Sequence, residues 1–522
     1  MLALCLSSLA LAQATNQPGG QDIEYRQGAV EGVQRLRLGA LMETQWHEYD
    51  NLDFRLIDES SDQAILDSDD RGNLAFSGAA FDLEYDVDDH TTIGLSTSLR
   101  GLWGNDQIGQ VSAFNSWLYF NNLYVKAYTN DPDGLSLTVG RQYYEIGGLG
   151  GTPDYVLADV VDWIRADIPL PGVGRLILIP INVAALSGDD AGPDFVSYLG
   201  QSDDPVFNMR GDRMTKRSGL VLQADDLPLP LQARAYAFYS DIGGSGTGAD
   251  ISYGGELGNF ADNDWVVNAG VRAQGEFGSF KPYAHFDFST GMDRKELVAE
   301  DVDAFGFAWG GGLAFRGQQE EGEESGDRSG LDAQLTYFDC LGPAYAENGL
   351  QYSHGYVGMK ARQAGGLIMN RYLGWHPTAY VGGSGISDTP QDMDRKSGTR
   401  VLNAGAEFAF KGPISVGAGW WYAQDTGVTY LAQGALDTIT PPFGYSREEF
   451  AAESRLGAGL GHEIDALFTA HITRSLDLTA TGGVLLPGDF YRTEIERVAG
   501  TALGSSDPAM AWAASGGTRV RF

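Results

Sequence analysis

The sequence lacks long apolar runs beyond its first residues, and it lacks linkers rich in Pro or Ser. A membrane-spanning helix needs about 20 consecutive apolar residues, so the first absence excludes one. The second indicates that the 522 residues form one large body and not a string of soluble domains. A transmembrane β-barrel remains compatible with both absences, because its lipid-facing residues alternate with polar ones and leave no long run.

Cysteine and basic residues are also scarce. The chain has two Cys residues, and loss of Cys5 with a leader would leave Cys340 alone, without an internal disulfide. Lys and Arg number 35 against 70 Asp and Glu, for a formal net charge of −35. Because like charges repel, nucleic acid is not expected as a partner.

The N-terminal residues MLALCLSSLALAQA are apolar and end in small residues. This pattern predicts a signal peptide over residues 1–14, or over 1–12 if cleavage follows the earlier pair of alanines. A lipoprotein signal at Cys5 is disfavoured, because Leu4 is too large for the position before a lipidated cysteine. Residues 15–32 are then expected to form a periplasmic segment, and 33–522 a barrel.

Apolar and polar residues alternate with a period of two in most of the remaining chain, which is typical of strands with one buried or lipid-facing side. The clearest case is 461–491, where two alternating runs flank a turn at Arg474-Ser475 and predict a β-hairpin. Segment 305–315 places aromatic residues on one face and only Gly or Ala on the other, down to Arg316. Segment 414–422 repeats this arrangement.

Short connections alternate with long polar ones along the chain, as in an outer-membrane barrel with periplasmic turns and extracellular loops. We expect an all-β, up-and-down antiparallel barrel of about 18 strands, with 16–20 as the range and even parity. Segments 363–373 and 376–386 are the weakest predicted strands. Parity also places the long acidic segment 317–330 on the periplasmic side, for which the sequence offers no physical reason.

The last strand ends in Phe522, which resembles the signal by which barrels are recognised by the barrel-assembly machinery. Aromatic residues at strand ends suit the girdles that lie at membrane interfaces. These are Trp46, Tyr49, Trp103, Trp117, Trp163, Trp265 and Trp512.

Three segments resemble the alginate-export family of outer-membrane barrels. The most specific is GHEIDALFTAHITRSLDLTATGGVLLPGDFY, with Gly461, Glu463, Ile464 and Asp465 at its start and Pro487-Gly488-Asp489 at its end. LSLTVGRQYYEIGG at 135–148 and TYFDCLGPAYAENG at 336–349 are also similar. The resemblance implies a monomeric barrel of roughly eighteen strands that conducts a polar solute. It leaves the solute open, because a polyuronate would favour a basic conduit and this chain is acidic.

Charged residues at positions expected to face the lumen are the pore-lining candidates. They are Arg35, Arg37, Glu43, Asp82, Glu84, Arg100, Arg141, Arg234, Arg272, Asp287, Arg316, Glu407, Glu463, Asp465 and Arg519. Arg141 shares the outward parity of Leu137 and Val139, so its inclusion needs a bulge at Gly140. The bulge is favoured over an interfacial position for Arg141. The alternative to a role in a constriction is a structural ion pair with Glu145.

Glu463 and Asp465 are two residues apart and share the lumenal face. A catalytic role would require a second group nearby that separates their pKa values, and a nucleophile. A lumenal hydrogen-bonded network with arginines is the favoured interpretation, and we expect no enzyme and no cofactor. Calcium could bind the acidic loop 48–72 or the segment 188–194, but their spacing does not match an EF-hand. The seven His residues show no paired zinc motif, and the glycines of 147–151 lack the context of a phosphate loop.

These observations predict a porin in a bacterial outer membrane, surrounded by lipid and lipopolysaccharide. It would pass a polar or charged solute or a polysaccharide, by diffusion or export. Two alternatives stay open. One is a barrel plugged by loops such as 184–216 or 425–460, which would act as a scaffold or receptor. The other is a membrane-embedded hydrolase.

Overall fold

A computed structural model of the chain describes the strands and the connections closest to them. The described residues are 26–27, 35–50, 72–102, 116–129, 134–146, 158–183, 215–242, 264–293, 302–317, 330–342, 344–345, 351–353, 355–358, 366–371, 398–427, 458–473, 475–490 and 509–521. The signal peptide, most of the acidic loop, segment 188–194, the glycines of 147–151, segment 376–386 and Phe522 lie outside them.

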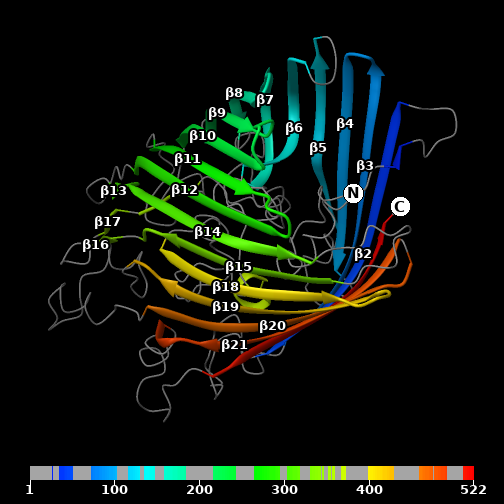
Figure 1. Cartoon of the computed structure of the whole chain (residues 1–522), viewed down its shortest axis with the longest axis vertical. Coiled ribbons are helices and arrows are strands. Elements are labelled where there is room, and N and C mark those ends of the chain that lie inside the picture. The colour runs from blue at the N-terminus through cyan, green and yellow to red at the C-terminus, as the bar shows by residue number, and fades with distance from the viewer. Residues whose placement is uncertain are drawn as a thin grey trace, which may run out of the picture.

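One continuous antiparallel wall dominates the structure (Figure 1). Of 22 strands in the sheet, four have two or three residues and the other eighteen form the wall. The wall strands are β2 (Leu36–Asp50), β3 (Gly72–Asp88), β4 (Thr91–Leu102), β5 (Ser116–Tyr128), β6 (Ser136–Glu145), β7 (Ala158–Leu170), β8 (Gly174–Val183), β9 (Thr215–Ala224), β10 (Leu231–Ile242), β11 (Asp264–Gly275), β12 (Phe280–Asp293), β14 (Gly306–Arg316), β15 (Gly330–Cys340), β18 (Thr399–Ala409), β19 (Ile414–Asp425), β20 (Gly459–His471), β21 (Leu476–Pro487) and β22 (Ala511–Arg521).

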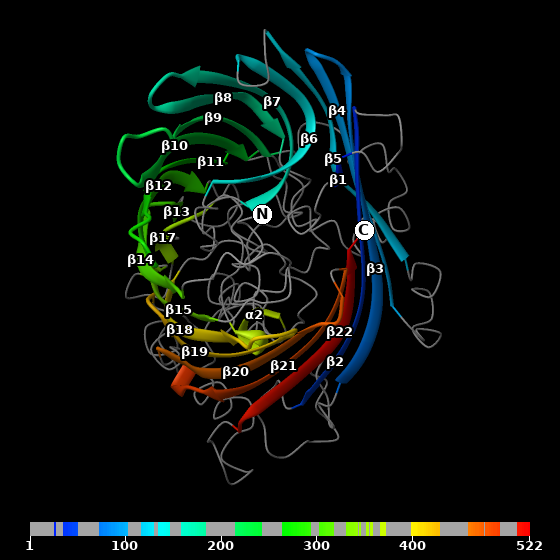
Figure 2. The same cartoon turned by 45° about the vertical axis from the view of Figure 1, so that its right-hand side comes forward.

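The wall closes on itself, because β2 pairs with β3 on one side and with β22 on the other. Leu41 lies opposite both Ala80 and Arg521 in register. Closure removes the unpaired edges that a sheet would otherwise present to lipid. The predicted all-β barrel of about 18 strands is therefore confirmed. β2 and β22 carry the two ends of the wall and lie side by side in Figures 1 and 2.

The wall strands alternate between an exposed apolar face and a buried face. On β20, Ile464 and Phe468 are exposed, whereas Glu463 and Asp465 are buried. On β14 the aromatic residues of the predicted lipid face, such as Trp309, are exposed and Ala308 is buried. The face of exposed apolar residues is the outside of the barrel, and the opposite face encloses the lumen.

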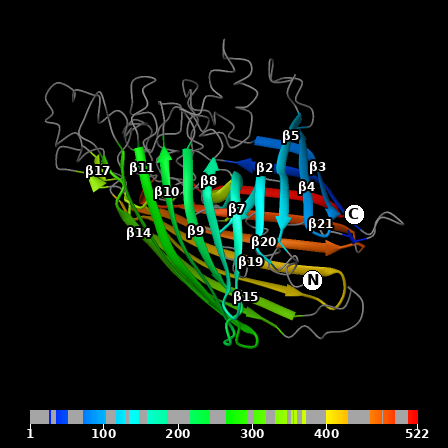
Figure 3. The ribbon, with the colours of Figure 1, turned by 90° about the horizontal axis from the view of Figure 1, so that it is seen from above.

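The predicted asymmetry between turns and loops follows from the strand ends. β3 and β4 are joined by Asp89 and His90 alone, and β7 and β8 by residues 171–173. A short turn also joins β11 to β12 and contains Ser279. β14 ends beside this turn, since the Arg316 amide donates to the Ser279 carbonyl. Segment 317–330 therefore begins on the predicted periplasmic side, although residues 318–329 are outside the described part. In Figure 3 the strands β7–β9 and β19–β21 form different sides of the ring.

The connection between β15 and β18 differs from the sequence prediction. It contains β16 (Ala344–Tyr345), β17 (Gln351–Ser353) and the helix α2 (Leu367–Arg371), so the strand predicted over 363–373 is wrong. The run Leu367-Ile368-Met369 is buried on consecutive positions. A strand with one face in lipid and one in the lumen would alternate, whereas a helical turn surrounded by protein need not. The described residues contain no helix long and apolar enough to cross a membrane.

The two other short strands pair with the ends of individual wall strands. β1 (Arg26–Gln27) pairs with β2 near the start of the barrel. β13 (Val302–Asp303) extends the pairing of β12 and runs parallel to β17, with Asp303 opposite Ser353. This contact brings the β15–β18 connection back to the ends of β12 and β14, from where it enters the barrel.

Candidate functional site

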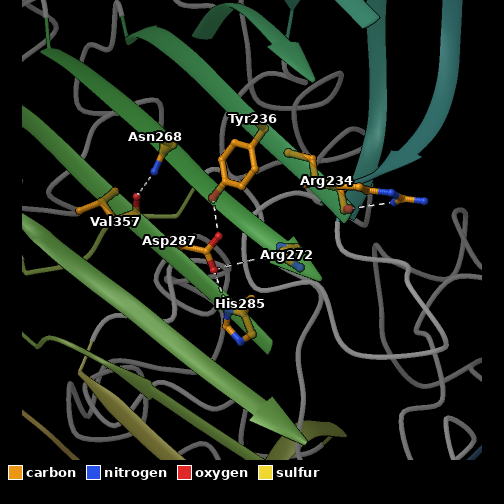
Figure 4. Close-up of polar contacts among 8 residues, drawn as sticks. Arg234, Tyr236, Asn268, Arg272, His285, Asp287 and Val357 are labelled. Carbon is orange, nitrogen blue, oxygen red and sulfur yellow. Dashed lines mark hydrogen bonds and ion pairs between the residues drawn. The ribbon is translucent and has the colours of Figure 1, made fainter. Parts of the chain in front are cut away.

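The lumenal face of β10, β11 and β12 carries a buried polar network centred on Asp287 (Figure 4). Tyr236 donates its hydroxyl to Asp287 Oδ1 at 2.6 Å, and His285 Nδ1 lies 2.8 Å from Asp287 Oδ2. Arg272 Nη2 lies 3.5 Å from the same Oδ2. Asp287 and Ser289 are fully buried, so this carboxylate is balanced by neighbouring side chains and not by bulk water.

Strand register explains how these residues meet. Gly270 lies between Tyr236 on β10 and Asp287 on β12 in the same cross-strand row. A Cβ atom at Gly270 would approach the Tyr236 ring within 2.7 Å and would also collide with the Asp287 carboxylate. The missing side chain therefore lets the tyrosine cross one strand and reach the carboxylate on the next.

A segment of the β15–β18 connection, residues 355–358, lies against this network. The Val357 carbonyl accepts a hydrogen bond from Asn268 Nδ2 at 2.6 Å, and its amide donates to Ser289 Oγ at 3.0 Å. Tyr356 is fully buried, and its amide donates to the Leu341 carbonyl. Lumenal side chains of β11 and β12 thus hold a backbone segment inside the ring of strands.

Across the barrel, two carboxylates on β20 hold α2. The Met369 amide donates to Glu463 Oε2 at 2.9 Å, and the Leu367 amide donates to Asp465 Oδ2 at 3.1 Å. The Ile368 amide donates to the other oxygen of Glu463. Donors at the first turn of a helix have no partner within the helix, so carboxylates satisfy them well. The predicted arginine partners are replaced here by backbone amides. Figure 2 shows α2 within the ring.

We call residues 355–358 and 366–371 the inner segment, and four of its residues, Tyr356 and Leu367–Met369, are buried in an apolar cluster. Its members come from the inner segment and from one end of β14, β15 and β18–β22. They are Ala308, Phe338, Cys340, Tyr356, Leu367, Ile368, Met369, Val401, Trp421, Ala423, Leu460, Leu485, Phe490, Ala511 and Ala513. Since β15 ends at Cys340 and β20 begins next to Leu460, the cluster lies at the loop end of the barrel. The inner segment therefore fills part of the lumen at this end.

The opposite, periplasmic end carries charged side chains in ion pairs. Arg37 contacts Glu84 and also Asp86, with the latter at 3.1 Å. Arg521 lies 3.0 Å from Asp477, which is also 2.6 Å from His471. These pairs join β2 with β3, and β20 and β21 with β22, and they keep charged groups on the lumenal face.

Eleven of the fifteen predicted pore-lining residues fall into four groups. Arg37, Glu84, Glu43 and Arg519 lie on the lumenal face in the periplasmic half, and Arg519 Nη2 is 3.7 Å from Glu43. Arg234, Arg272 and Asp287 lie on β10–β12, where Arg234 Nη1 donates to the Ile146 carbonyl at 2.8 Å. Arg316 and Glu407 both neighbour Asp332 in register. Glu463 and Asp465 hold α2.

The remaining candidates are Arg35, Arg100, Arg141 and Asp82. Arg35 precedes β2 and pairs with Asp89 in the turn, outside the wall strands. Asp82 is buried on the lumenal face of β3. The side chain of Arg100 lies outside the described part of the chain.

The predicted lumenal position of Arg141 is wrong. The register of β5 and β6 runs without a shift through Gly140 and Arg141, so no bulge turns the side chain inward. Gly140 has a φ of 125° but keeps its place opposite Tyr124. Arg141 points outward and pairs with Asp162 at 2.6 Å, and the side chain of Glu145, its predicted partner, lies outside the described part of the chain.

Several lumenal residues were not singled out from the sequence. Tyr236, Asn268, His285 and Ser289 look like ordinary strand residues, and only their alternation with outward apolar residues could have marked them. Trp163 was expected in an interfacial girdle but is buried on the lumenal face, where Nε1 donates to Gln142 at 3.2 Å. Arg165 lies over its ring, 5.2 Å from the centroid. Among the described residues, no group of three or more His, Cys, Asp or Glu side chains could hold a metal ion.

Neither a protein-family model nor a curated protein matches the chain. Solved structures of similar fold include the outer membrane protein opdK from Pseudomonas aeruginosa, at 8% identity and a TM-score of 0.44, covering 94% of this chain and 99% of that chain. OccAB1 from Acinetobacter baumannii has 10% identity and a TM-score of 0.47, covering 96% and 100%. OccK11 (OpdR) from Pseudomonas aeruginosa has 11% identity and a TM-score of 0.43, covering 96% and 99%. Similarity at this level assigns no function to the chain.

The barrel itself fixes the location of the protein. Large apolar side chains are exposed over the outside of the wall, including Phe81, Val271, Phe286 and Ile464. Such an exterior is stable in hydrocarbon, and a closed barrel satisfies every backbone hydrogen bond there. Antiparallel barrels with short turns at one end are the outer-membrane type, so the chain resides in a bacterial outer membrane.

Proposed function

We propose that the protein is a channel that moves a polar or charged solute across the outer membrane and that the inner segment forms its narrow point. The observation that supports the proposal most directly is the charge on the lumenal face. A wall needs only an apolar outside to stay in lipid, and the inside of this one carries Arg and carboxylate side chains, several of them in ion pairs between neighbouring strands. A hydrophilic interior lowers the free energy of a polar solute relative to hydrocarbon.

The charges are distributed unevenly around the ring. Lumenal arginines follow one another on β7–β11, namely Arg165, Arg217, Arg234 and Arg272. Lumenal carboxylates follow one another on β18–β21, namely Glu407, Glu463, Asp465 and Asp477. These two sets of strands lie across the barrel from each other (Figure 1). The two walls therefore differ in the sign of these mostly buried charges, and Arg165 and Arg272 are paired with Asp167 and Asp287 on their own side.

The inner segment is anchored to both of these walls. Asn268 and Ser289 hold it on the arginine side, and Glu463 and Asp465 hold it on the carboxylate side. An element fixed at both sides narrows the passage and carries its own groups into it. The identity and charge of the solute would then depend on the inner segment as well as on the wall.

Single-channel recording in planar bilayers tests the proposal. The full chain should give stepwise conductance, and Glu463→Gln should increase it or add fast gating. Each carboxylate oxygen of Glu463 accepts from one backbone amide of α2, and Gln replaces one of these oxygens by an NH2 group that cannot accept. Glu43→Gln is the matched control, since Glu43 is also a buried lumenal carboxylate but pairs with Arg519. A chain that conducts nothing, with either glutamate intact or replaced, would exclude the channel.

A second function is favoured by the apolar cluster around the inner segment. An interior packed with Phe338, Tyr356 and Ile368 resembles a protein core more than a water-filled passage. It supports a plugged barrel that serves as a scaffold or receptor. The two functions differ in one measurement: a plugged barrel is silent in wild-type form and conducts only when Glu463→Gln or a deletion frees the inner segment.

Membership of the alginate-export family is part of the same proposal. The residues that carry the resemblance meet at one end of the β20–β21 hairpin, where Gly461 lies opposite Pro487 and the Gly459 amide donates to Asp489 at 2.6 Å. Gly461 has a φ of 124° and approaches the Leu486 carbonyl, a position that only glycine fits easily. The motif would therefore shape the strand that holds the inner segment.

A further inference from the structure

The outer surface of β14, β15 and β18–β20 carries polar and aromatic side chains near its loop end. Their neighbours along the strands, such as Phe338, Val401 and Glu463, are buried on the lumenal face. Successive strand residues point to opposite faces, so these side chains point outward. Strand register places them in two adjacent rows, one of Trp309, Asp339, Arg400 and Gln424, and one of Tyr337, Leu402, Tyr422 and His462. We call the two rows, with Trp420 beside them, the outer patch.

Hydrogen bonds join the polar members of the outer patch across three strands. Arg400 donates to Asp339 Oδ2 from Nε at 3.0 Å and from Nη2 at 2.9 Å, and its Nη1 lies 3.4 Å from Gln424 Oε1. The Tyr337 hydroxyl donates to the same Asp339 oxygen at 2.8 Å. Gln424 in turn donates to the Tyr422 hydroxyl. The Arg400 side chain is 43% exposed, so these bonds hold a guanidinium in a fixed orientation on the outside of the wall.

Aromatic rings flank this guanidinium on both sides. The Trp309 ring lies 4.9 Å from the Tyr337 ring. On the other side, the His462 ring stacks on Tyr422 at 4.7 Å and on Trp420 at 5.9 Å. Trp309 and His462 are exposed. The outer patch therefore presents flat rings and a charged, planar donor side by side.

The depth of the outer patch identifies its surroundings. Except for Trp420, its members are among the first or last four residues of their strands, at the ends opposite the short turns. In an outer-membrane barrel these ends face the outside of the cell. Trp and Tyr side chains favour the boundary between hydrocarbon and head groups. The outer patch therefore lies level with the head groups of the outer leaflet.

We propose that the outer patch binds the head group of lipopolysaccharide, a phosphorylated glucosamine disaccharide. A guanidinium has five N–H donors, so two beyond the three bonds of Arg400 can bind phosphate oxygens, a pairing that arginine favours. The rings of Trp309 and Trp420 would pack against the apolar faces of the sugars. Asp339 is the one carboxylate of the outer patch, and it would accept a hydrogen bond from a sugar hydroxyl.

The next row of outward residues suits the acyl chains of the same lipid. Leu335 and Ile464 lie in register with Ala404 and Trp420, one row closer to the middle of the membrane. Both are 54% exposed. Sugar-binding and acyl-binding groups thus follow one another in the order in which a glycolipid presents its parts. This inference concerns the outside of the wall and is independent of channel function.

Native mass spectrometry of the full chain in detergent tests the proposal, with bisphosphorylated lipid A as the probe. The wild-type chain should retain one lipid A molecule. D339L/R400L should bind it at least about tenfold more weakly, because hydrogen bonds to a charged group are lost. Leucine suits a lipid face, so this variant should still fold, as judged by heat-modifiable migration on gels. The control R141L/D162L removes an outward ion pair from β6 and β7 and should bind like the wild type.

A second comparison tests the aromatic rings and decides the matter if D339L/R400L does not fold. Trp420→Leu should weaken lipid A binding about threefold or more, because a ring that packs on the sugars is lost. Trp265→Leu is the matched control, since Trp265 is also an outward ring near the loop end of its strand, where it stacks on Tyr239 at 6.5 Å. Its binding should be unchanged.

A third comparison varies the lipid. The wild-type chain should bind dephosphorylated lipid A and phosphatidylglycerol at least about tenfold more weakly than bisphosphorylated lipid A, because the first lacks the phosphates and the second lacks the sugars. Equal binding of phosphatidylglycerol would overturn the proposal. Wild-type affinity in folded D339L/R400L would also overturn it, as would equal losses in Trp420→Leu and Trp265→Leu.

Discussion

Tyr236 donates a hydrogen bond of 2.6 Å to Asp287 although a whole strand separates them, and it does so across Gly270. This contact does two things for the barrel wall: it joins β10 to β12, and it gives a buried carboxylate a hydrogen-bond donor. The strands must stay paired, and a charged group on the lumenal face must keep its partners. It also lies beside Asn268 and Ser289, the residues that hold Val357, so the network and the inner segment share one wall.

Gly270→Ala should destabilise the barrel. Its Cβ would approach the Tyr236 ring and the Asp287 carboxylate and displace one of them, at a cost of about 1–3 kcal/mol. Urea unfolding in lipid vesicles, followed by tryptophan fluorescence, measures this. Gly482→Ala is the control, because the nearest atom to its added Cβ is 3.9 Å away. Equal stability of the two variants would contradict the close packing at Gly270.

Tyr236→Phe should cost about 1–3 kcal/mol in the same assay, because it removes a hydrogen bond to a fully buried carboxylate. Tyr239→Phe on the same strand is the control. Tyr239 points outward and is exposed, so its hydroxyl should contribute little. A larger loss at Tyr239 than at Tyr236 would show that the network does not stabilise the wall.

Ser289→Ala should loosen the inner segment while leaving the wall intact. The Val357 amide would lose its acceptor, and its hydrogen exchange should become at least about tenfold faster if the lost bond contributes more than about 1.4 kcal/mol. Mass spectrometry of exchanged peptides measures this. Ser240→Ala is a matched control, because the Ser240 hydroxyl is buried without a hydrogen-bond partner in the described structure. Unchanged exchange at Val357 would mean that Asn268 alone fixes the segment.

Arg37→Gln should shift ion selectivity toward cations. It removes a positive charge from the periplasmic half of the lumenal face and leaves Glu84 and Asp86 without that partner. Reversal potentials across a salt gradient measure the shift. Arg400→Gln removes the same charge from the outer face and should leave the potential unchanged. The opposite ranking of the two variants would place the ion path elsewhere.

The wall could be predicted from the sequence because lipid imposes a strict pattern on it. Each of Ile464, Ala466 and Phe468 must face hydrocarbon, and each of Glu463 and Asp465 must not, so a period of two is visible without any structure. The same strict alternation placed Arg141 outward. The prediction from sequence departed from this alternation, because it assumed a bulge at Gly140 that would turn Arg141 toward the lumen. The register of β5 and β6 contains no such bulge.

The interior was harder to predict because no single solvent shapes it. Leu367, Ile368 and Met369 resemble a short strand in sequence, but they pack inside the barrel against residues more than 90 positions away. Trp163 is of a residue type that is common in membrane girdles, yet it faces the lumen beside Arg165. Which side of a wall a given aromatic residue occupies depends on register, and register depends on partners that are distant in the chain.

The anchoring of α2 also joins two parts of the chain that are far apart in sequence. Glu463 and Asp465 belong to β20, which is made long after the residues that they hold, and Leu367 and Asp465 are separated by 98 positions. A chain that ended before β20 would lack the acceptors for the amides of Leu367 and Met369. The position of α2 therefore depends on the last third of the wall being in place, although α2 itself belongs to the connection that precedes β18.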